Sequence, residues 1–302
     1  MDANMIKMNG IIVPIITPMY ENEEINYDEL QNQTERMIDE GIDGIFAFGT
    51  NGEGYILDER EKEKVLACVI ETVAGRVPVY AGTGCIGTMD TIRQSKMAEA
   101  MGADVLSVIT PSFAAASQEE LYEHYRKVAG EVKIPLLLYN IPARTGNRLS
   151  PETVERLSHI DNILGVKDSS GNFSNMLSYI DKTKGRDEFT VLSGNDDLIL
   201  WCLMAGGGGG VSGCANVYPA HMASIYDSFL AGDMEGAKKA QEEIRAFRSC
   251  FAYGNPNTIV KMAVSLLGYP VGRCRAPFQR IPEDGIRKLE EVLARNRAEG
   301  MH

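Results

Sequence analysis

Lys167 stands where an apolar run of the sequence ends. Residues 163–171 read ILGVKDSSG, and the first four of them are apolar, as in a buried strand. A lysine at the end of a strand often does no more than reach for water. A desolvated lysine, in contrast, loses its proton more readily, and its neutral amine can attack a carbonyl carbon to form a Schiff base. The groups that surround Lys167 decide between these two interpretations.

Polar groups follow several other apolar runs in the same way. GTNGE (residues 49–53) offers backbone N–H groups and the Thr50 hydroxyl as a cradle for a carboxylate, with a plain tight turn as the alternative. YNIPARTG (residues 139–146) begins with Tyr139, whose hydroxyl could transfer protons while a carbinolamine forms and dehydrates. SGND (residues 193–196) contains Gly194, which we expect to line the same site.

The elements that must position these groups alternate along the chain. Short runs rich in Val, Ile and Leu predict eight strands, at residues 11–17, 44–49, 77–82, 104–110, 135–140, 163–168, 189–194 and 209–214. Segments with helical periodicity lie between them, at residues 27–40, 58–74, 88–101, 118–131 and 151–159. Apolar strands joined by helical crossovers indicate parallel pairing. Eight such units predict an α/β fold of the (β/α)8 TIM-barrel type, with a doubly wound open sheet as the alternative.

The chain continues beyond the last predicted strand with helical segments at residues 219–230, 233–252, 258–267 and 282–297. Three of these exceed what a barrel needs. We therefore predict a catalytic barrel domain over residues 1–230 and a C-terminal helical extension over residues 231–302 that packs on it. The active site of such a barrel lies at the carboxyl ends of its strands, which is where Lys167, Tyr139 and Thr50 are expected.

Charge and composition exclude several classes of function. The 302 residues contain 30 Lys and Arg against 42 Asp and Glu, a formal charge of −12, with no block of basic residues. Such a surface repels nucleic acid and anionic membranes, so neither is an expected partner. The N-terminus lacks the pattern of a signal peptide and no apolar stretch is long enough to span a bilayer, which predicts a cytoplasmic protein.

Cofactor and metal signals are weak. The six cysteines include no C-x-x-C pair and the four histidines are far apart, so we expect no metal site. GTGCIG (residues 82–87) fits a dinucleotide fingerprint, but it follows the third predicted strand, and the next strand ends without an acidic residue that would bind a ribose. We expect no cofactor.

The motifs GTNGE, YNIPARTG and GVKDSSG (residues 165–171), in this order on the second, fifth and sixth strands, resemble the dihydrodipicolinate synthase/N-acetylneuraminate lyase family of pyruvate-dependent class I aldolases. The resemblance extends through nearly the whole chain. It implies a Schiff base between Lys167 and pyruvate or another 2-oxo acid, with Tyr139 as general acid and base. It also implies that Thr50 and Asn51 hold the carboxylate and that the backbone at Val211 lines the pocket.

Arg144 in ARTG is similar to the arginine with which synthases of this family hold the carboxylate of the second substrate, an aldehyde. Two positions depart from the synthases. Asn51 replaces a second hydroxyl residue, and Phe113 replaces a tyrosine that reaches across a subunit interface to complete a proton relay. The loop PSFAAAS (residues 111–117) is poor in polar side chains, which fits burial against another subunit. Together with this loop, the family resemblance implies a homodimer or homotetramer.

Three functions stay open. Arg144 favours synthesis of the dihydrodipicolinate type from pyruvate and an aldehyde. Asn51 and Phe113 favour an aldolase or dehydratase that acts on 4-hydroxy-2-oxoglutarate or on 2-oxo-3-deoxy sugar acids. A barrel that binds a small acid without turning it over is the third.

Overall fold

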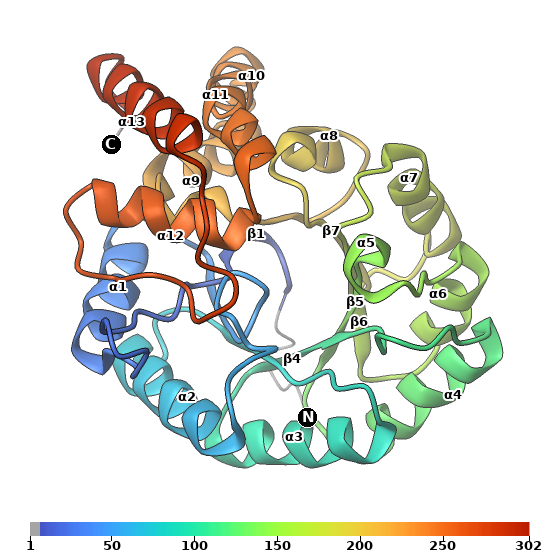
Figure 1. Ribbon diagram of the computed structural model, residues 1–302. Coiled ribbons are helices and arrows are strands. Elements are labelled where there is room, and N and C mark those ends of the chain that lie inside the picture. Colours follow the sequence, from blue (N-terminus) through green and yellow to red (C-terminus); the bar gives the residue numbers. More distant parts are fainter. Residues whose placement is uncertain (1–6, 302) are drawn as a thin grey trace. The chain divides into compact units, whose positions relative to one another are not determined.

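The computed structural model describes residues 7–301, and its strands form a closed parallel barrel in the order β1 to β8 (Figure 1). The predicted eight-stranded α/β barrel is therefore confirmed. Each strand lies inside the range predicted for it except β1, which begins one residue earlier. The strands are β1 (Gly10–Val13), β2 (Gly44–Ala47), β3 (Val79–Gly82), β4 (Val105–Ile109), β5 (Leu136–Asn140), β6 (Ile163–Asp168), β7 (Thr190–Ser193) and β8 (Gly209–Val211).

Helices connect consecutive strands. They are α1 (Tyr27–Asp39), α2 (Glu59–Val73), α3 (Thr88–Met101), α4 (Gln118–Ala129), α5 (Pro142–Thr145), α6 (Pro151–Ser158), α7 (Phe173–Lys182) and α8 (Ile199–Met204). The start of α2 follows from a capping box, in which Asp58 accepts from the Glu61 N–H and the Glu61 carboxylate accepts from the Asp58 N–H. Ser117 and Glu120 begin α4 in the same way.

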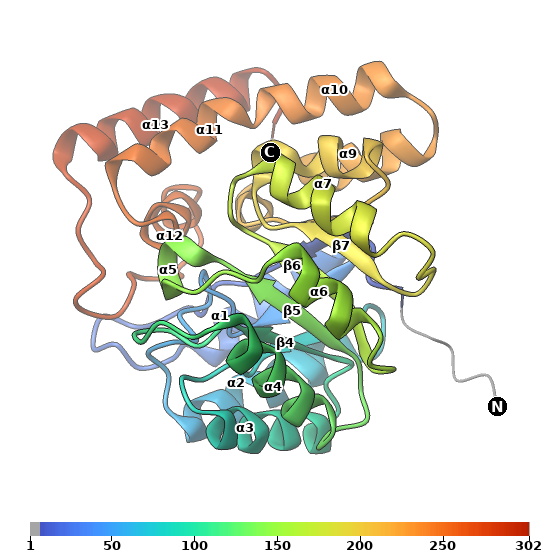
Figure 2. The same cartoon turned by 90° about the vertical axis from the view of Figure 1, so that its right-hand side faces the viewer.

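Five further helices follow the barrel strands: α9 (Pro219–Leu230), α10 (Met234–Glu243), α11 (Arg245–Ser249), α12 (Pro256–Leu266) and α13 (Glu283–Ala298). The prediction of a single helix over residues 233–252 is wrong, because α10 and α11 are separate at Ile244. The N–H of Ile244 bonds the Glu242 carbonyl, while the Ala240 carbonyl, its regular helical partner, lies 2.9 Å from His221 Nε2. Figure 2 shows α10 and α11 nearly in line, with α13 beside α11.

The chain divides into two compact units. Among the described residues, one comprises residues 7–10 and 78–211, and the other comprises residues 11–77 and 212–301. The boundary that we predict at residue 230 lies within the second unit, and the division into a barrel domain and an extension stays a prediction. In the first unit β5 and β6 are buried along their whole length, as expected for strands covered on both faces.

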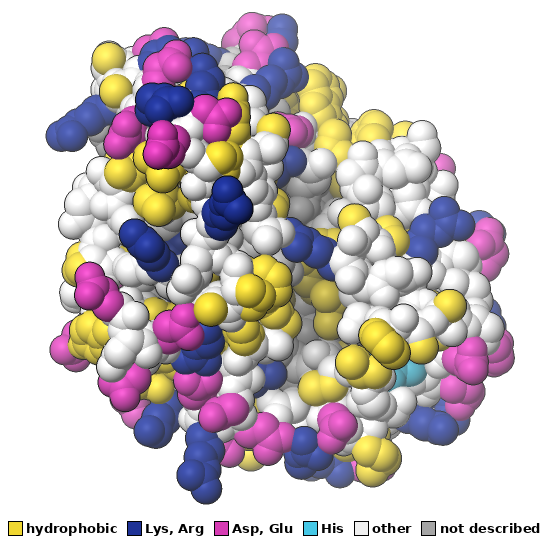
Figure 3. Space-filling view, viewed as in Figure 1, with side chains coloured by type: hydrophobic (Ala, Val, Ile, Leu, Met, Phe, Trp, Pro, Cys, Tyr) yellow, Lys and Arg dark blue, Asp and Glu magenta, His cyan; other side chains and the backbone are white. Residues whose placement is uncertain are grey.

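Charged side chains of both signs are interspersed on the face shown in Figure 3. Among residues 7–301, no helix combines the length and the apolar character that crossing a bilayer requires. The predicted absence of nucleic-acid and membrane partners is not tested by these observations.

His124 on α4 makes the stability of the fold depend on pH. Its Nδ1 lies 2.9 Å from the Thr88 hydroxyl, and its buried Nε2 has no hydrogen-bond partner among the described residues. Burial lowers the pKa of His124 to about 4 from 6.5. The unfolded chain therefore binds a proton below pH 6.5, whereas the folded chain does so only near pH 4. The contribution of the neutral His124 to the free energy of unfolding is fully present above pH 6.5. It is lost as the pH falls toward 4, by about 3 kcal/mol in total.

We expect His124→Gln to flatten the fall in the free energy of unfolding between pH 7 and pH 4.5, measured by urea denaturation at each pH. His159→Gln is the control, because His159 is exposed and meets solvent in both states. Equal slopes for the unmodified chain and His124→Gln would contradict this assignment.

Candidate active site

Lys167 and Tyr139 lie side by side on neighbouring strands. Tyr139 of β5 is in register with Lys167 of β6, and each is only 4% exposed. The Lys167 Nζ lies 3.9 Å from the centroid of the Tyr139 ring. Because in-register residues of parallel strands point to the same face, both side chains belong to one face of the sheet. The structure thus brings together the predicted nucleophile and the predicted acid and base.

Asn140 and Asp168, which directly follow Tyr139 and Lys167, point to the other face of the sheet and hold the strand ends there. Asn140 Nδ2 donates to Asp168 Oδ1 over 2.9 Å, and Asp168 Oδ2 accepts from the Ser170 hydroxyl at 2.9 Å and from Asn175 Nδ2 at 3.0 Å. The Ser169 N–H also donates to the Asn140 carbonyl. Asn140 and Asp168 thereby fix the backbone that carries Tyr139 and Lys167. Sequence reasoning gave them no role, although both stand in the motifs it quoted.

Gly194 lies directly after β7, and its N–H donates to the Asp168 carbonyl at 2.8 Å. A Cβ at this position would meet the Ser169 hydroxyl and would come within 2.9 Å of Lys167 Cε. The missing side chain therefore leaves the space that the Lys167 side chain occupies. Val211 ends β8 in the same compact unit and is 2% exposed. That Gly194 and Val211 contact substrate stays a prediction.

Gly194→Ala is expected to displace the Lys167 amine without unfolding the chain, because the two atoms nearest to the new methyl, Ser169 Oγ and Lys167 Cε, belong to side chains that can rotate away. A displacement of about 1 Å can cost about 100-fold in rate. We expect pyruvate and borohydride to modify Lys167 about 100-fold more slowly in this variant. Intact-mass measurement over time gives the rate of modification. Gly130→Ala is the matched control, since a Cβ there makes only ordinary contacts, the nearest at 3.5 Å from a carbonyl oxygen. Equal trapping rates in the two variants would contradict the prediction.

Thr50 and Asn51 belong to a turn in the second compact unit. The Glu53 N–H donates to the Thr50 carbonyl at 3.2 Å, and the Thr17 hydroxyl donates to the Gly52 carbonyl at 2.7 Å. Asn51 is 7% exposed and packs against Gly213, where a Cβ would lie 2.6 Å from its Nδ2. These contacts define the turn closely. That Thr50 and Asn51 share a site with Lys167 stays a prediction.

Glu53, the last residue of the same motif, forms a buried ion pair that sequence reasoning missed. Its Oε1 lies 2.8 Å from Lys261 Nζ, and both side chains are at most 1% exposed. Its Oε2 accepts from the Arg275 N–H at 2.8 Å. The Arg275 guanidinium in turn bonds both oxygens of Glu61. The motif GTNGE is thus fixed to the C-terminal part of the chain, a connection that no local sequence signal indicates.

Arg144 and Phe113 lie on two loops of the first unit. Arg144 is exposed on the short helix α5, which directly follows β5 (Figure 1). Phe113 is 98% exposed and has a φ of 78°, a left-handed conformation that is uncommon for a bulky residue. An exposed phenylalanine in a strained loop fits the predicted contact with another subunit. The roles of Arg144 and Phe113 both stay predictions.

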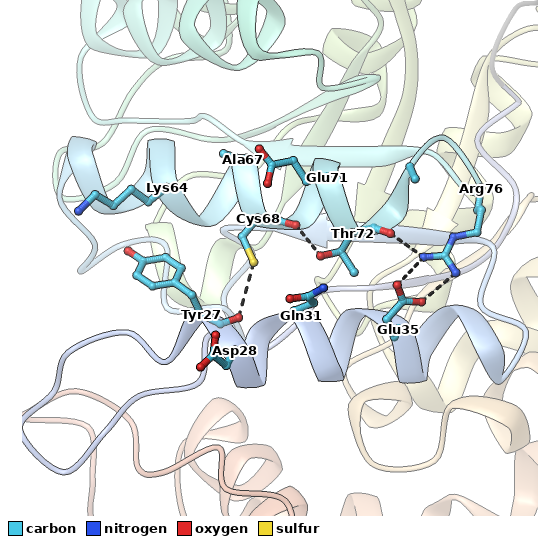
Figure 4. A pocket seen from close by; sticks show the side chains of 11 residues that line it. Tyr27, Asp28, Gln31, Glu35, Lys64, Ala67, Cys68, Glu71, Thr72 and Arg76 are labelled. Atoms are coloured by element: carbon cyan, nitrogen blue, oxygen red, sulfur yellow. Dashed lines mark hydrogen bonds and ion pairs between the residues drawn. The ribbon is translucent and has the colours of Figure 1, made fainter.

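A separate groove of ≈ 650 Å³ lies between α1 and α2 and contains none of the predicted site residues (Figure 4). Arg76 and Glu35 pair at 2.8 Å at one end of it. Cys68 lies near its middle, where burial raises the pKa of the thiol. Within residues 7–301, no three His, Cys, Asp or Glu side chains come together as metal ligands.

Comparison with known proteins gives the chain its relatives. Residues 7–296 match the model of the dihydrodipicolinate synthetase family. The chain is 40% identical to a 4-hydroxy-tetrahydrodipicolinate synthase of Syntrophus aciditrophicus, over 94% of this chain and 97% of the relative. It is 34% identical to an uncharacterized DapA-like lyase of Halobacterium salinarum, over 95% and 93% of the two chains. It also resembles the crystal structure of a chloride-inhibited dihydrodipicolinate synthase from Acinetobacter baumannii complexed with pyruvate, with a TM-score of 0.92 and 32% identity over 98% and 100% of the chains.

Proposed function

The chain belongs to the dihydrodipicolinate synthetase family of class I lyases, and on that premise we propose that it joins pyruvate to an aldehyde through a Schiff base on Lys167. The named activity that we propose is that of 4-hydroxy-tetrahydrodipicolinate synthase. The observation that carries the proposal is the buried Lys167 amine, 3.9 Å from the centroid of the Tyr139 ring. Membership of the family supports the dependence on pyruvate. The geometry supports Lys167 as the nucleophile and Tyr139 as the neighbouring group that carries protons.

The proposed reaction begins when the Lys167 amine attacks the ketone carbon of pyruvate to give a carbinolamine. Tyr139 donates a proton to the departing hydroxide, so that water leaves and an iminium remains. Loss of a proton from the methyl carbon gives an enamine, whose carbon attacks the aldehyde carbon; the C=O π bond of the aldehyde breaks, and its oxygen takes up a proton to become a hydroxyl. Water then adds to the new iminium and releases the product from the lysine.

Charged and polar groups around Lys167 are proposed to hold the two substrates. The turn of Thr50 and Asn51 would bind the pyruvate carboxylate through its N–H groups and the Thr50 hydroxyl. The Arg144 guanidinium would bind a carboxylate of the aldehyde substrate, for which its planar fork of donors is suited. Gly194 and Val211 would line the pocket, and the exposed Phe113 loop would join subunits in a homodimer or homotetramer.

The experiment that tests the proposal is incubation with pyruvate and borohydride, followed by intact-mass measurement and peptide mapping. We expect one reduced pyruvyl adduct on Lys167 and none in Lys167→Arg, which keeps the positive charge but has no nucleophilic amine. A folded chain without an adduct, or with the adduct on another lysine, would contradict the assignment of Lys167.

A second function is favoured by Phe113, which has no hydroxyl to complete a proton relay and is 98% exposed. We propose as the alternative an aldolase or dehydratase that acts on 4-hydroxy-2-oxoglutarate or on 2-oxo-3-deoxy sugar acids. Turnover assays with pyruvate plus aspartate semialdehyde, and with 4-hydroxy-2-oxoglutarate alone, distinguish the two. Efficient condensation with aspartate semialdehyde would exclude the alternative, and efficient cleavage in its absence would favour it.

A further inference from the structure

We propose that Asn147 is a positioning residue that fixes the loop after β4, which carries Phe113, to the loop after β5, which carries Arg144. By holding the two loops as one unit, Asn147 would set the affinity for the second substrate. The inference rests on the proposed function, because it takes Arg144 as the group that binds the aldehyde substrate.

Asn147 uses its whole side-chain amide on the loop that carries Phe113. It is 3% exposed, and its Nδ2 donates to the Pro111 carbonyl and to the Ala114 carbonyl, each at 2.8 Å. Its Oδ1 accepts from the Ala116 N–H, also at 2.8 Å. These three hydrogen bonds join residues separated by 31 to 36 positions in the sequence. One side chain therefore fastens the loop at three points.

A second set of hydrogen bonds joins the same two loops. The Thr110 hydroxyl at the end of β4 donates to the Thr145 hydroxyl of α5 at 2.8 Å, and the Thr145 hydroxyl lies 3.0 Å from the Asn147 carbonyl. Thr110 is 1% and Thr145 5% exposed, so water competes little for these bonds. We call the hydrogen bonds of Asn147, Thr110 and Thr145 the clamp. Because Thr145 directly follows Arg144, the clamp joins the helix that carries the guanidinium to the same loop.

The clamp explains how an unfavourable backbone conformation persists. Phe113 has a φ of 78° and its side chain points into solvent, so the residue itself supplies little stabilisation. Such a conformation is retained only where its surroundings determine it. The bonds from Asn147 to Pro111, Ala114 and Ala116 lie on both sides of Phe113 and do so. Loss of Asn147 would release the loop and, through Thr145, loosen the placement of Arg144.

Asparagine is the side chain that this position requires. The neutral amide presents two N–H donors toward two carbonyls and one acceptor toward an N–H. Aspartate has the same shape but only acceptors, so its second oxygen would face the carbonyl oxygens of Pro111 and Ala114. Asn147→Asp therefore removes two hydrogen bonds and adds repulsion with almost no change in volume.

The chain offers a matched control in Asn162, which lies just before the amino end of β6. Its Nδ2 also donates to two backbone carbonyls, those of Ala129 at 2.9 Å and Val132 at 3.1 Å. Asn162→Asp makes the same chemical change, and it does so at the opposite end of the strand that carries Lys167. It separates a general loss of stability from an effect on the two loops.

The test compares these two variants with the unmodified chain in three measurements. In Asn147→Asp we expect faster hydrogen exchange over residues 111–117 and a KM for the aldehyde probe raised at least about tenfold, equivalent to about 1.4 kcal/mol. The probe is aspartate semialdehyde, or 4-hydroxy-2-oxoglutarate if the chain turns over only that compound. We expect the yield of the Lys167–pyruvate adduct to stay unchanged. Asn162→Asp should leave both the loop exchange and the KM unaltered.

Thr145→Val provides a second route if Asn147→Asp does not fold. It removes the buried hydroxyl with its hydrogen bonds to Thr110 and to the Asn147 backbone, leaves the Asn147 side chain in place, and should raise KM in the same direction. Unchanged exchange and KM in the Asn147 variant, or an equal rise of KM in Asn162→Asp, would overturn the proposal. An unmodified chain that forms no adduct would overturn the proposed function instead, and the exchange measurement tests the clamp without any substrate.

Discussion

Tyr139→Phe is expected to lower kcat by about 10²- to 10⁴-fold, the usual contribution of a positioned acid or base. The substitution removes one oxygen and leaves the ring against which Lys167 lies, at 3.9 Å from Nζ to the centroid. Lys167 should therefore keep its position, and the loss should come from proton transfer. Borohydride should still trap the pyruvate adduct on Lys167, but more slowly than in the unmodified chain.

The matched control for this loss is Tyr125→Phe. Tyr125 likewise lies buried in the first compact unit, and its hydroxyl donates to the Val108 carbonyl at 3.1 Å. Its removal should cost about 1 kcal/mol of stability, as for a typical buried hydrogen bond, and should leave kcat unchanged. A kcat for Tyr139→Phe within twofold of the unmodified chain would show that another group, or water, moves the protons.

Sequence reasoning located the chemistry at the strand ends because apolar runs and the polar residues that follow them are local signals. The strand at residues 163–168 is found with the predicted bounds, which places Lys167 and Asp168 at its end. Tyr139 is found one residue before the end of β5, in register with Lys167. Parallel pairing of neighbouring strands was enough to predict that these two side chains would meet.

Contacts between residues distant in sequence could not be predicted from such local signals. Asn147 looks like a turn residue after a glycine, and nothing local indicates that its amide bonds a loop more than 30 positions earlier. At the break between α10 and α11, the Ala240 carbonyl lies 2.9 Å from a His221 ring that approaches from another helix. In each case the deciding partner comes from a different element, and only the folded chain brings it into place.

The Glu53–Lys261 pair carries the largest effect on stability that we expect. Lys261→Met leaves the Glu53 carboxylate buried without its cation, and breaking a buried pair in this way costs about 3–5 kcal/mol. The pair is at most 1% exposed with its charged atoms 2.8 Å apart, so water cannot replace the lost ammonium without opening the fold. The free energy of unfolding in urea measures the cost. Glu53→Gln combined with Lys261→Met should recover most of it, because the neutral amide oxygen can still accept from the Arg275 N–H.

Lys96→Met is the control, since Lys96 pairs with Glu131 on the surface with about half of each side chain exposed, and such a pair contributes less than about 1 kcal/mol.

Glu53 also donates through its N–H to the Thr50 carbonyl, so a displaced Glu53 should loosen the turn proposed to hold pyruvate. Lys261→Met should therefore raise the KM for pyruvate, and the double variant should restore it together with stability. Recovery of stability without recovery of KM would mean that the charged pair itself, and not the packing around it, holds the turn in place.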